Sequence, residues 1–170
     1  MIYYFGSAFN PLTLAHQKII ADIASSLTTG DNLIVGVTTH EYKDYEYSRD
    51  FRYELIYNYM FNTYPMYTTK FHWQVWNQYE RTWKFLNTVF KPEDQKNICL
   101  IIGQDEYDSL LKGEWHFHQE ILNTYKIKII PRTDNISSTT VRNLLKQNAT
   151  WEELSPFISK ETYDKIKQYI

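Results

Sequence analysis

Two stretches of the sequence carry residue types suited to binding phosphate, and the first follows the opening apolar run. Residues 6–16 read Gly-Ser-Ala-Phe-Asn-Pro-Leu-Thr-Leu-Ala-His. Gly and Pro in this stretch favour a stiff, tight turn, and Thr13 is a natural N-cap for a following helix. His16 then falls at about the third helical position, beside N–H groups that lack a helical partner. An anion here would satisfy these amides and a protonated imidazole together. An ordinary capped helix with a surface histidine has the same spacing.

The second stretch runs from Pro131 to Arg142 and contains four consecutive hydroxyl residues, 137–140. These residues open a predicted helix, where side-chain oxygens and free N–H groups can face an oxyanion. Arg142 lies three residues beyond Thr139, so both side chains project from the same side of the helix. The planar guanidinium fork suits a phosphate. The alternative is a simple Ser/Thr-capped helix with a solvated arginine, but four hydroxyl groups exceed what a cap needs.

Short β-rich runs alternate with helical patterns along the chain. Predicted strands, each bounded by polar or turn residues, are Ile2–Phe5, Asn32–Thr38, Lys70–Trp76, Ile98–Ile102 and Lys126–Pro131. The spacing of apolar residues predicts helices at 13–27, 51–60, 83–90, 141–145 and in the last turns before Ile170. A capping box at Thr150–Glu153 predicts the start of a further helix. This alternation predicts an α/β, Rossmann-like, doubly wound sheet of five to six mostly parallel strands with helices on both faces. We expect one domain, 1–170, whose C-terminal part from about 138 is a small helical segment.

Ligands of such sheets bind at the carboxyl ends of the strands, near the switch in strand order. The fourth predicted strand delivers Gly103 and Asp105 to this edge, and Trp115 follows shortly after. Gly103 permits close backbone approach, Asp105 could bond ribose hydroxyls, and Trp115 could stack on a flat ring. A strand-ending turn, a helix cap and a core tryptophan are the alternative interpretations of these three residues.

Composition narrows the class of protein. The chain has 170 residues, 18 Lys and Arg against 20 Asp and Glu, and a net charge of −2. It is too apolar and aromatic for a disordered chain, and it has no apolar run long enough for a membrane helix. The start lacks a basic n-region, so we expect a cytoplasmic protein without a secretory signal. The balance of charge disfavours nucleic acid as a partner.

Cysteine and histidine usage gives no reason to expect a resident metal. The single cysteine, Cys99, lies in an apolar run and is predicted to be a buried hydrophobe. His116 and His118 are two residues apart, so on a helix they would point in different directions and could not share an ion.

The two phosphate-type stretches, in this order and on these elements, resemble the signatures of the nucleotidyltransferase superfamily with (His/Thr)-x-x-His and Ile-Ser-Ser-Thr-x-x-Arg motifs. That superfamily transfers a nucleotidyl group and releases pyrophosphate. Thr13 stands where the first histidine of the motif often lies, and Ala15 stands where glycine is common. The resemblance implies that His16 and Arg142 are catalytic. The implied ATP-binding residues are Ser7, Ala8, Phe9, Thr13, His16, Gly103, Asp105, Arg132, Ser138, Thr139, Thr140 and Arg142.

The run Ile-Ile-Gly-Gln-Asp followed by Trp115, and the C-terminal Tyr-Ile, resemble nicotinate/nicotinamide mononucleotide adenylyltransferases. In that branch the Asp contacts a nucleotide ribose and the Trp packs on the pyridine ring. Lys43 follows the second predicted strand, where the family places a cation near the phosphates. Tyr79 and Thr82 resemble the family's aromatic-x-x-Thr, which faces the mononucleotide. Lys43, Tyr79, Thr82 and Trp115 are therefore the implied substrate-binding residues. Arg52 resembles an arginine that opens the next helix and supports the site.

The resemblance implies adenylyl transfer from ATP to nicotinamide or nicotinate mononucleotide in NAD biosynthesis, with Mg²⁺ carried on the triphosphate. Pantetheine-phosphate adenylyltransferases and cytidylyltransferases share some of the motifs, and a non-catalytic nucleotide sensor would retain the binding residues. The sequence does not decide between the two pyridine nucleotides. With 15 Tyr and 5 Trp, the chain has enough aromatic surface for a homo-oligomer interface as well as a core.

Overall fold

The structure is a computed structural model that describes residues 1–67, 69–131 and 138–169. The predictions made for Arg132 and Ile170 lie outside these residues. The strands are β1 (Ile2–Ser7), β2 (Asn32–Thr38), β3 (His72–Gln78), β4 (Ile98–Gly103) and β5 (Lys126–Ile130). The helices are α1 (Leu14–Ser26), α2 (Arg49–Thr63), α3 (Thr82–Val89), α4 (Gln104–Leu111), α5 (His118–Thr124), α6 (Ser138–Lys146), α7 (Trp151–Leu154) and α8 (Lys160–Gln168). A short 3₁₀ turn, Gln95–Asn97, precedes β4.

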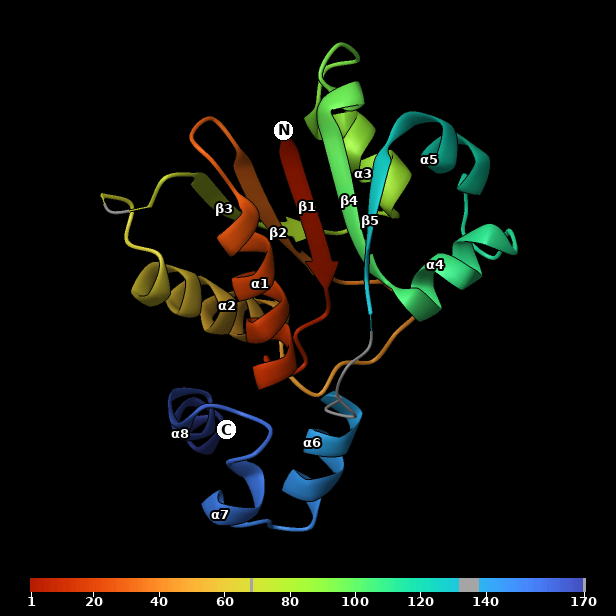
Figure 1. Ribbon diagram of the computed structural model, residues 1–170. Coiled ribbons are helices and arrows are strands. Elements are labelled where there is room, and N and C mark those ends of the chain that lie inside the picture. The colour runs from red at the N-terminus through yellow and green to blue at the C-terminus, as the bar shows by residue number, and fades with distance from the viewer. Residues whose placement is uncertain (68, 132–137, 170) are drawn as a thin grey trace.

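The strands form one parallel five-stranded sheet in the order β3-β2-β1-β4-β5. The chain builds one half of the sheet outward from β1, returns to the centre, and builds the other half from β4 (Figure 1). The strand order therefore switches between β1 and β4, where a doubly wound sheet opens a crevice at its carboxyl edge. The predicted doubly wound α/β fold is confirmed.

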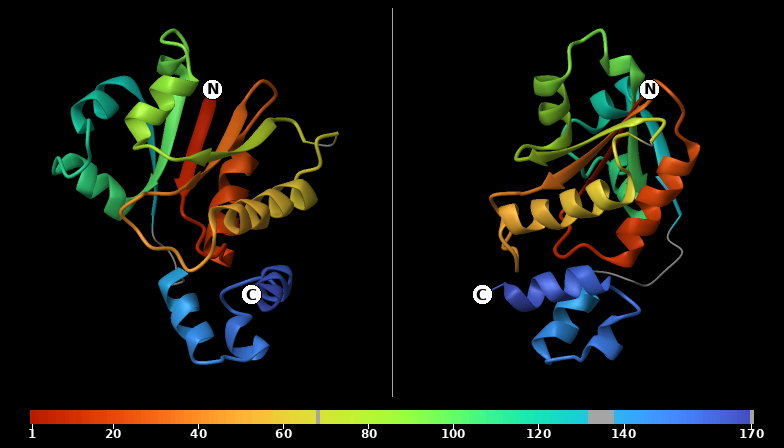
Figure 2. Two further views of the ribbon diagram at one scale, coloured as in Figure 1. Left: turned by 180° about the vertical axis from the view of Figure 1, so that it is seen from behind. Right: turned by 90° about the vertical axis from the view of Figure 1, so that its left-hand side faces the viewer.

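Each face of the sheet buries an apolar layer under its own set of helices. Phe5 faces α1 and α2, while its neighbour Tyr4 faces α3, α4 and α5, because successive side chains of a strand point to opposite faces. Both faces are covered, as the continuous apolar runs of parallel strands require. The two further views show α1 and α2 on one side and α3 on the other (Figure 2).

The C-terminal helices lie beyond the carboxyl edge of the sheet in every view (Figures 1 and 2). They enclose a small core that includes Val141, Leu154 and Ile158 and that also takes in Tyr47 from the segment before α2. The predicted capping box is present: Glu153 N donates to Thr150 Oγ1 at 3.3 Å, and Thr150 N donates to a Glu153 carboxylate oxygen at 2.7 Å. Among the described residues, every helix is too short or too polar to span a bilayer.

Strand β3 and two helices differ from the sequence prediction. The third strand was expected at Lys70–Trp76, but β3 runs two residues later, because the ladder to β2 continues as far as Gln78 opposite Thr38. Helices α4 and α5 were not predicted. Each has only seven or eight residues and a short apolar stripe, so the helical period is too brief to detect. Cys99 is buried, as expected.

Gly36 allows the Tyr4 ring to cross the neighbouring strand. A Cβ atom at Gly36 would lie 2.0 Å from Tyr4 Oη and 2.6 Å from Cζ. We expect Gly36→Ala to lower the free energy of unfolding by about 1 to 3 kcal/mol, as overpacking of a core does. Urea denaturation followed by circular dichroism measures this. Gly103→Ala is the control, since its Cβ would meet nothing closer than 3.9 Å; equal losses in the two variants would contradict the steric account.

Candidate active site

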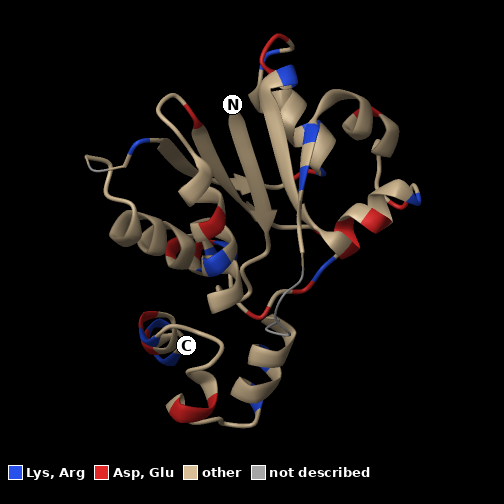
Figure 3. Ribbon diagram, viewed as in Figure 1, with Lys and Arg blue, Asp and Glu red and all other residues tan. Residues whose placement is uncertain are grey.

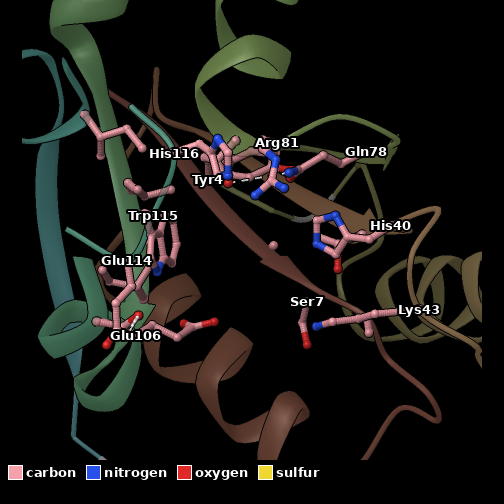
Figure 4. A pocket seen from close by; sticks show the side chains of 18 of the residues that line it. Tyr4, Ser7, His40, Lys43, Gln78, Arg81, Glu106, Glu114, Trp115 and His116 are labelled. Atoms are coloured by element: carbon pink, nitrogen blue, oxygen red, sulfur yellow. Dashed lines mark hydrogen bonds between the residues drawn. The ribbon is translucent and has the colours of Figure 1, made fainter. Parts of the chain in front are cut away.

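A cavity of about 620 Å³ opens at the carboxyl ends of β1, β2, β3 and β4 (Figure 4). It lies where the strand order switches, as expected for a ligand site in this type of sheet. Its volume is in the range of small-molecule and cofactor sites. The polar side chains of its wall include Ser7, Thr38, His40, Lys43, Gln78, Arg81, Thr82, Asp105, Glu106, Glu114 and His116.

The loop after β1 carries His16 in a fixed orientation. Thr13 caps α1, and the cap is reciprocal: His16 N donates to Thr13 Oγ1 at 3.3 Å, and Thr13 N donates to His16 Nδ1 at 3.0 Å. His16 is therefore the third helical residue, as predicted. Because Nδ1 accepts this hydrogen bond, the proton of a neutral ring resides on Nε2. Nε2 lies 3.2 Å from Ser7 Oγ, and Ser7 lines the cavity.

Burial favours the neutral form of the His16 imidazole. Burial lowers its pKa to about 4, since the charged form loses its hydration. The protonated ring considered at the sequence level is therefore not the resting form. A neutral Nε2–H can donate to an anionic oxygen, and a nearby anion would raise the pKa of His16 by favouring the cation.

Arg142 connects the second predicted phosphate-binding stretch, residues 131–142, to the first, residues 6–16, by a hydrogen bond. Its Nη1 donates to the Asn10 carbonyl at 2.7 Å, and its Nη2 donates to Thr139 Oγ1 at 3.0 Å. The shared side of α6 that the spacing predicted for Thr139 and Arg142 is thus present. Ser138 Oγ also donates to the Pro11 carbonyl, at 2.9 Å. The start of α6 is therefore anchored on the β1–α1 loop.

Arg52, near the start of α2, is 1% exposed and holds two loops of the site together. Its Nη1 donates to the carbonyls of Ala8 and Thr38, both at 2.9 Å. Nε donates to the Tyr47 carbonyl and Nη2 to Thr39 Oγ1. Within the described residues this cation has no carboxylate partner, so its charge adds a positive potential beside the cavity.

The walls of the cavity differ in charge. Lys43 and Arg81 stand on the wall formed after β2 and β3, whereas Asp105, Glu106 and Glu114 line the wall formed by α4 and the following loop. Figure 3 shows the acidic start of α4. Burial and the nearby cations of Lys43 and Arg81 lower the pKa of His40, which favours its neutral form. A ligand with an anionic group facing the wall of Lys43 and Arg81, and hydroxyl groups facing the acidic wall, would match this distribution of charge.

The residues expected from sequence are distributed between the cavity wall and its support. Six line the cavity: Ser7, Ala8, Lys43, Thr82, Asp105 and Trp115. His16, Ser138, Thr139 and Arg142 lie on the two phosphate-type elements behind Ser7 and Ala8, and Thr140 belongs to the same turn of α6. Arg132 lies outside the described residues.

Four of the expected residues do not present a free group to the cavity. The Phe9 side chain is fully buried in the core, and Thr13 is 1% exposed with its hydroxyl engaged by His16. Gly103 N donates to a Glu106 carboxylate oxygen at 3.0 Å, so this amide is already satisfied. Tyr79 is 51% exposed and stacks on the Arg49 guanidinium, outside the cavity wall.

Tyr4 and Gln78 form the floor of the cavity, and neither was predicted from the sequence to belong to the site. Tyr4 Oη donates to Gln78 Oε1, and Gln78 Nε2 donates to the Glu80 carbonyl at 2.8 Å. Burial raises the pKa of Tyr4, which keeps the phenol protonated. Tyr4 lies inside an apolar strand and so appeared to be only a core residue. Tyr4 lies on β1 and Gln78 on β3, 74 residues apart in the sequence. Their contact depends on how the strands pair, which no short stretch of sequence predicts.

Titration of His16 by NMR tests the state of the ring. The apo protein should show a His16 pKa near 4, and saturation with MgATP should raise it. Because the pKa of an unfolded histidine is about 6.5, this ring should lower the stability of the apo protein as the pH falls from about 6.5 to 4. A pKa near 6.5 in the apo protein, or no shift with bound MgATP, would contradict the assignment.

Arg52→Met should lower the free energy of unfolding by about 3 kcal/mol, because several buried carbonyl oxygens lose a charged donor. Arg49→Met removes a more exposed arginine from the same helix and should change stability by less than about 0.5 kcal/mol. Urea denaturation of both variants measures the difference. Similar stabilities of the two variants would show that Arg52 does not organise the loops.

Comparison with known proteins agrees with the fold. Solved structures with a similar fold include a Vibrio parahaemolyticus protein assigned as a nicotinate-nucleotide adenylyltransferase, with 19% identity, TM-score 0.71, and coverage of 98% of this chain and 91% of that one. Two others are of Plasmodium falciparum nicotinic acid mononucleotide adenylyltransferase. The complex with NaAD has 17% identity, TM-score 0.69, and coverage of 99% and 95%. The complex with APC has 16% identity, TM-score 0.67, and coverage of 99% and 94%.

These identities are low, so the solved structures establish the fold. No curated protein sequence matches the chain significantly. A sequence model of the cytidylyltransferase-like family, in contrast, matches residues 4–155, which include most of β1, all of β2 to β5 and both phosphate-type elements. The chain therefore belongs to the cytidylyltransferase-like family.

Proposed function

We propose that the protein transfers the adenylyl group of ATP to nicotinamide or nicotinate mononucleotide, forming NAD or deamido-NAD and pyrophosphate. The observation that carries this proposal is the meeting of the two phosphate-type elements on one loop. His16 contacts Ser7 from one side, and Arg142 holds the Asn10 carbonyl from the other. This loop borders a cavity that also contains Trp115, an aromatic surface for a flat ring.

The reaction needs no general base, because the phosphate of the mononucleotide is already ionised. One of its oxygens attacks the α-phosphorus of ATP. The new P–O bond forms as the bond from the α-phosphorus to the α,β-bridging oxygen breaks, and pyrophosphate leaves with that electron pair. Catalysis then consists of positioning and charge stabilisation.

Different residues are proposed to bind the phosphates, the ribose and the mononucleotide, according to where they lie around the cavity. His16 Nε2 donates to the α- and β-phosphate region, and the first turn of α6 with Arg142 holds the β- and γ-phosphates. Lys43 adds a cation at the same end, and Arg132 belongs to this set by the sequence argument. Asp105 accepts from ribose hydroxyls, while Trp115 and Thr82 contact the mononucleotide.

Mg²⁺ enters with the triphosphate as part of the substrate. The described residues contain no cluster of three or more His, Cys, Asp or Glu side chains arranged to hold a metal ion. We propose that the ion keeps water ligands and uses phosphate oxygens, as Mg²⁺ does at many nucleotide sites. A cytoplasmic location and a homo-oligomeric state stay predictions.

A substrate comparison tests the proposed activity. The wild-type protein is incubated with MgATP and, in parallel, nicotinamide mononucleotide, nicotinate mononucleotide or phosphopantetheine, and products are separated by chromatography. A dinucleotide from either pyridine nucleotide is the expected result. Product from phosphopantetheine alone would make Trp115 a structural residue and the proposed acceptor wrong. The sensor alternative would be supported if the protein binds ATP but forms no product with any acceptor, and forms none when CTP replaces ATP.

His16→Ala should lower kcat by about two to three orders of magnitude, because one positioned donor to the developing charge is lost. The residue also completes the cap of α1, so circular dichroism must show an intact fold in the same sample. A variant that keeps most of its turnover would remove His16 from the reaction.

Arg142→Ala should mainly raise the KM for ATP, with a smaller effect on the KM for the mononucleotide. Arg142→Lys is the matched variant, since it retains the charge but not the fork that spans Asn10 and Thr139. An unchanged KM for ATP in both variants would argue against a role for Arg142 in binding the triphosphate.

A further inference from the structure

Arg81 is a cation of the cavity wall for which the proposed reaction, as described above, has no use. It directly precedes α3, and its side chain lines the same cavity as Trp115. Figure 4 draws its guanidinium at the end of the cavity formed by Tyr4 and Gln78, well away from Ser7. Tyr4 Oη donates to Gln78 Oε1 and Gln78 Nε2 donates to the Glu80 carbonyl, so both neutral side chains are satisfied and Arg81 brings a formal positive charge to this end.

The guanidinium has no acceptor within the described part of the chain. Its contact is with the Tyr42 ring, whose centroid is 5.7 Å from Arg81 Cζ. No described carboxylate forms an ion pair with it, although acidic side chains line the opposite wall. It also makes no side-chain cap for α3. A forked donor that faces a cavity without a protein partner is suited to an anionic group of the ligand.

That anionic group is not a phosphate in the proposed arrangement. In that arrangement Ser7, His16 and the start of α6 bind the phosphates, and Lys43 lines the same cavity as Ser7. A mononucleotide whose phosphate lies there has the rest of the cavity, toward Tyr4 and Arg81, for its ring (Figure 4). The group that distinguishes its two forms is the substituent of the pyridine ring, a carboxylate in one and a neutral amide in the other.

We infer that Arg81 binds the carboxylate of the pyridine ring and makes nicotinate mononucleotide the preferred acceptor. This inference rests on the proposed function. The carboxylate accepts a charge-assisted, bidentate hydrogen bond from the guanidinium, whereas the amide offers one neutral oxygen and a competing donor. Loss of such a bond corresponds to a factor of about 10 to 100 in kcat/KM.

The test is the ratio of kcat/KM for nicotinate mononucleotide to that for nicotinamide mononucleotide in the wild type and in Arg81→Gln. We expect the wild type to favour the nicotinate form. Arg81→Gln should lower kcat/KM for that form about 10- to 100-fold and change the value for the nicotinamide form by less than about threefold. Lys84→Gln is the matched control, since Lys84 is an exposed cation of α3 outside the cavity wall; it should leave both values unchanged.

Each other result overturns the inference in a recognisable way. An equal loss for both mononucleotides would assign Arg81 to a phosphate. An unchanged ratio in Arg81→Gln, with active enzyme, would remove Arg81 from recognition while the proposed function stands. A wild-type protein that converts neither mononucleotide would instead reject the proposed function, and this inference with it. Calorimetric binding of deamido-NAD and NAD to both variants gives the same comparison without turnover.

Discussion

The buried guanidinium of Arg52 is the interaction on which the geometry of the site depends. Its Nη1 donates to the carbonyl of Ala8, which follows β1, and to the carbonyl of Thr38, the last residue of β2. The chain segments that leave these two strands are thereby held together. The described residues give Arg52 no carboxylate partner; backbone carbonyls, the Thr39 hydroxyl and the face of the Tyr45 ring stabilise the charge, and its field extends beside the cavity. One residue thus positions two loops and favours anions between them, as the proposed binding of a triphosphate requires.

The C-terminal helices complete this arrangement from the other side. Arg142 and Ser138 bond to the carbonyls of Asn10 and Pro11, and Leu14 N donates to the Phe157 carbonyl at 2.8 Å. Residues more than 120 positions apart in the sequence therefore share one loop. The β1–α1 loop is held at both ends and along its length, so His16 is positioned before a ligand arrives. Such preorganisation is how a site stabilises developing charge without reorganising during the reaction.

The parts of the structure that depend on local pattern were predictable, and those that depend on long-range pairing were not. The parallel sheet, the Thr13 cap and the shared side of Thr139 and Arg142 follow from residue type and spacing. The bond from Tyr4 to Gln78 and the position of Arg81 depend on register between strands and on how β3 ends, which no short window contains. The neutral state of His16 depends likewise on the packing around it, and not on its place in a motif.

The most direct test of the account is a crystal structure with a non-transferable ATP analogue and a pyridine mononucleotide bound together. The account predicts that the triphosphate lies against Ser7, His16 and the first turn of α6. The mononucleotide phosphate should face the α-phosphorus, and the pyridine ring should lie between Trp115 and Arg81. A triphosphate at the Tyr4 end of the cavity, or one bound without contact to His16 and α6, would contradict it.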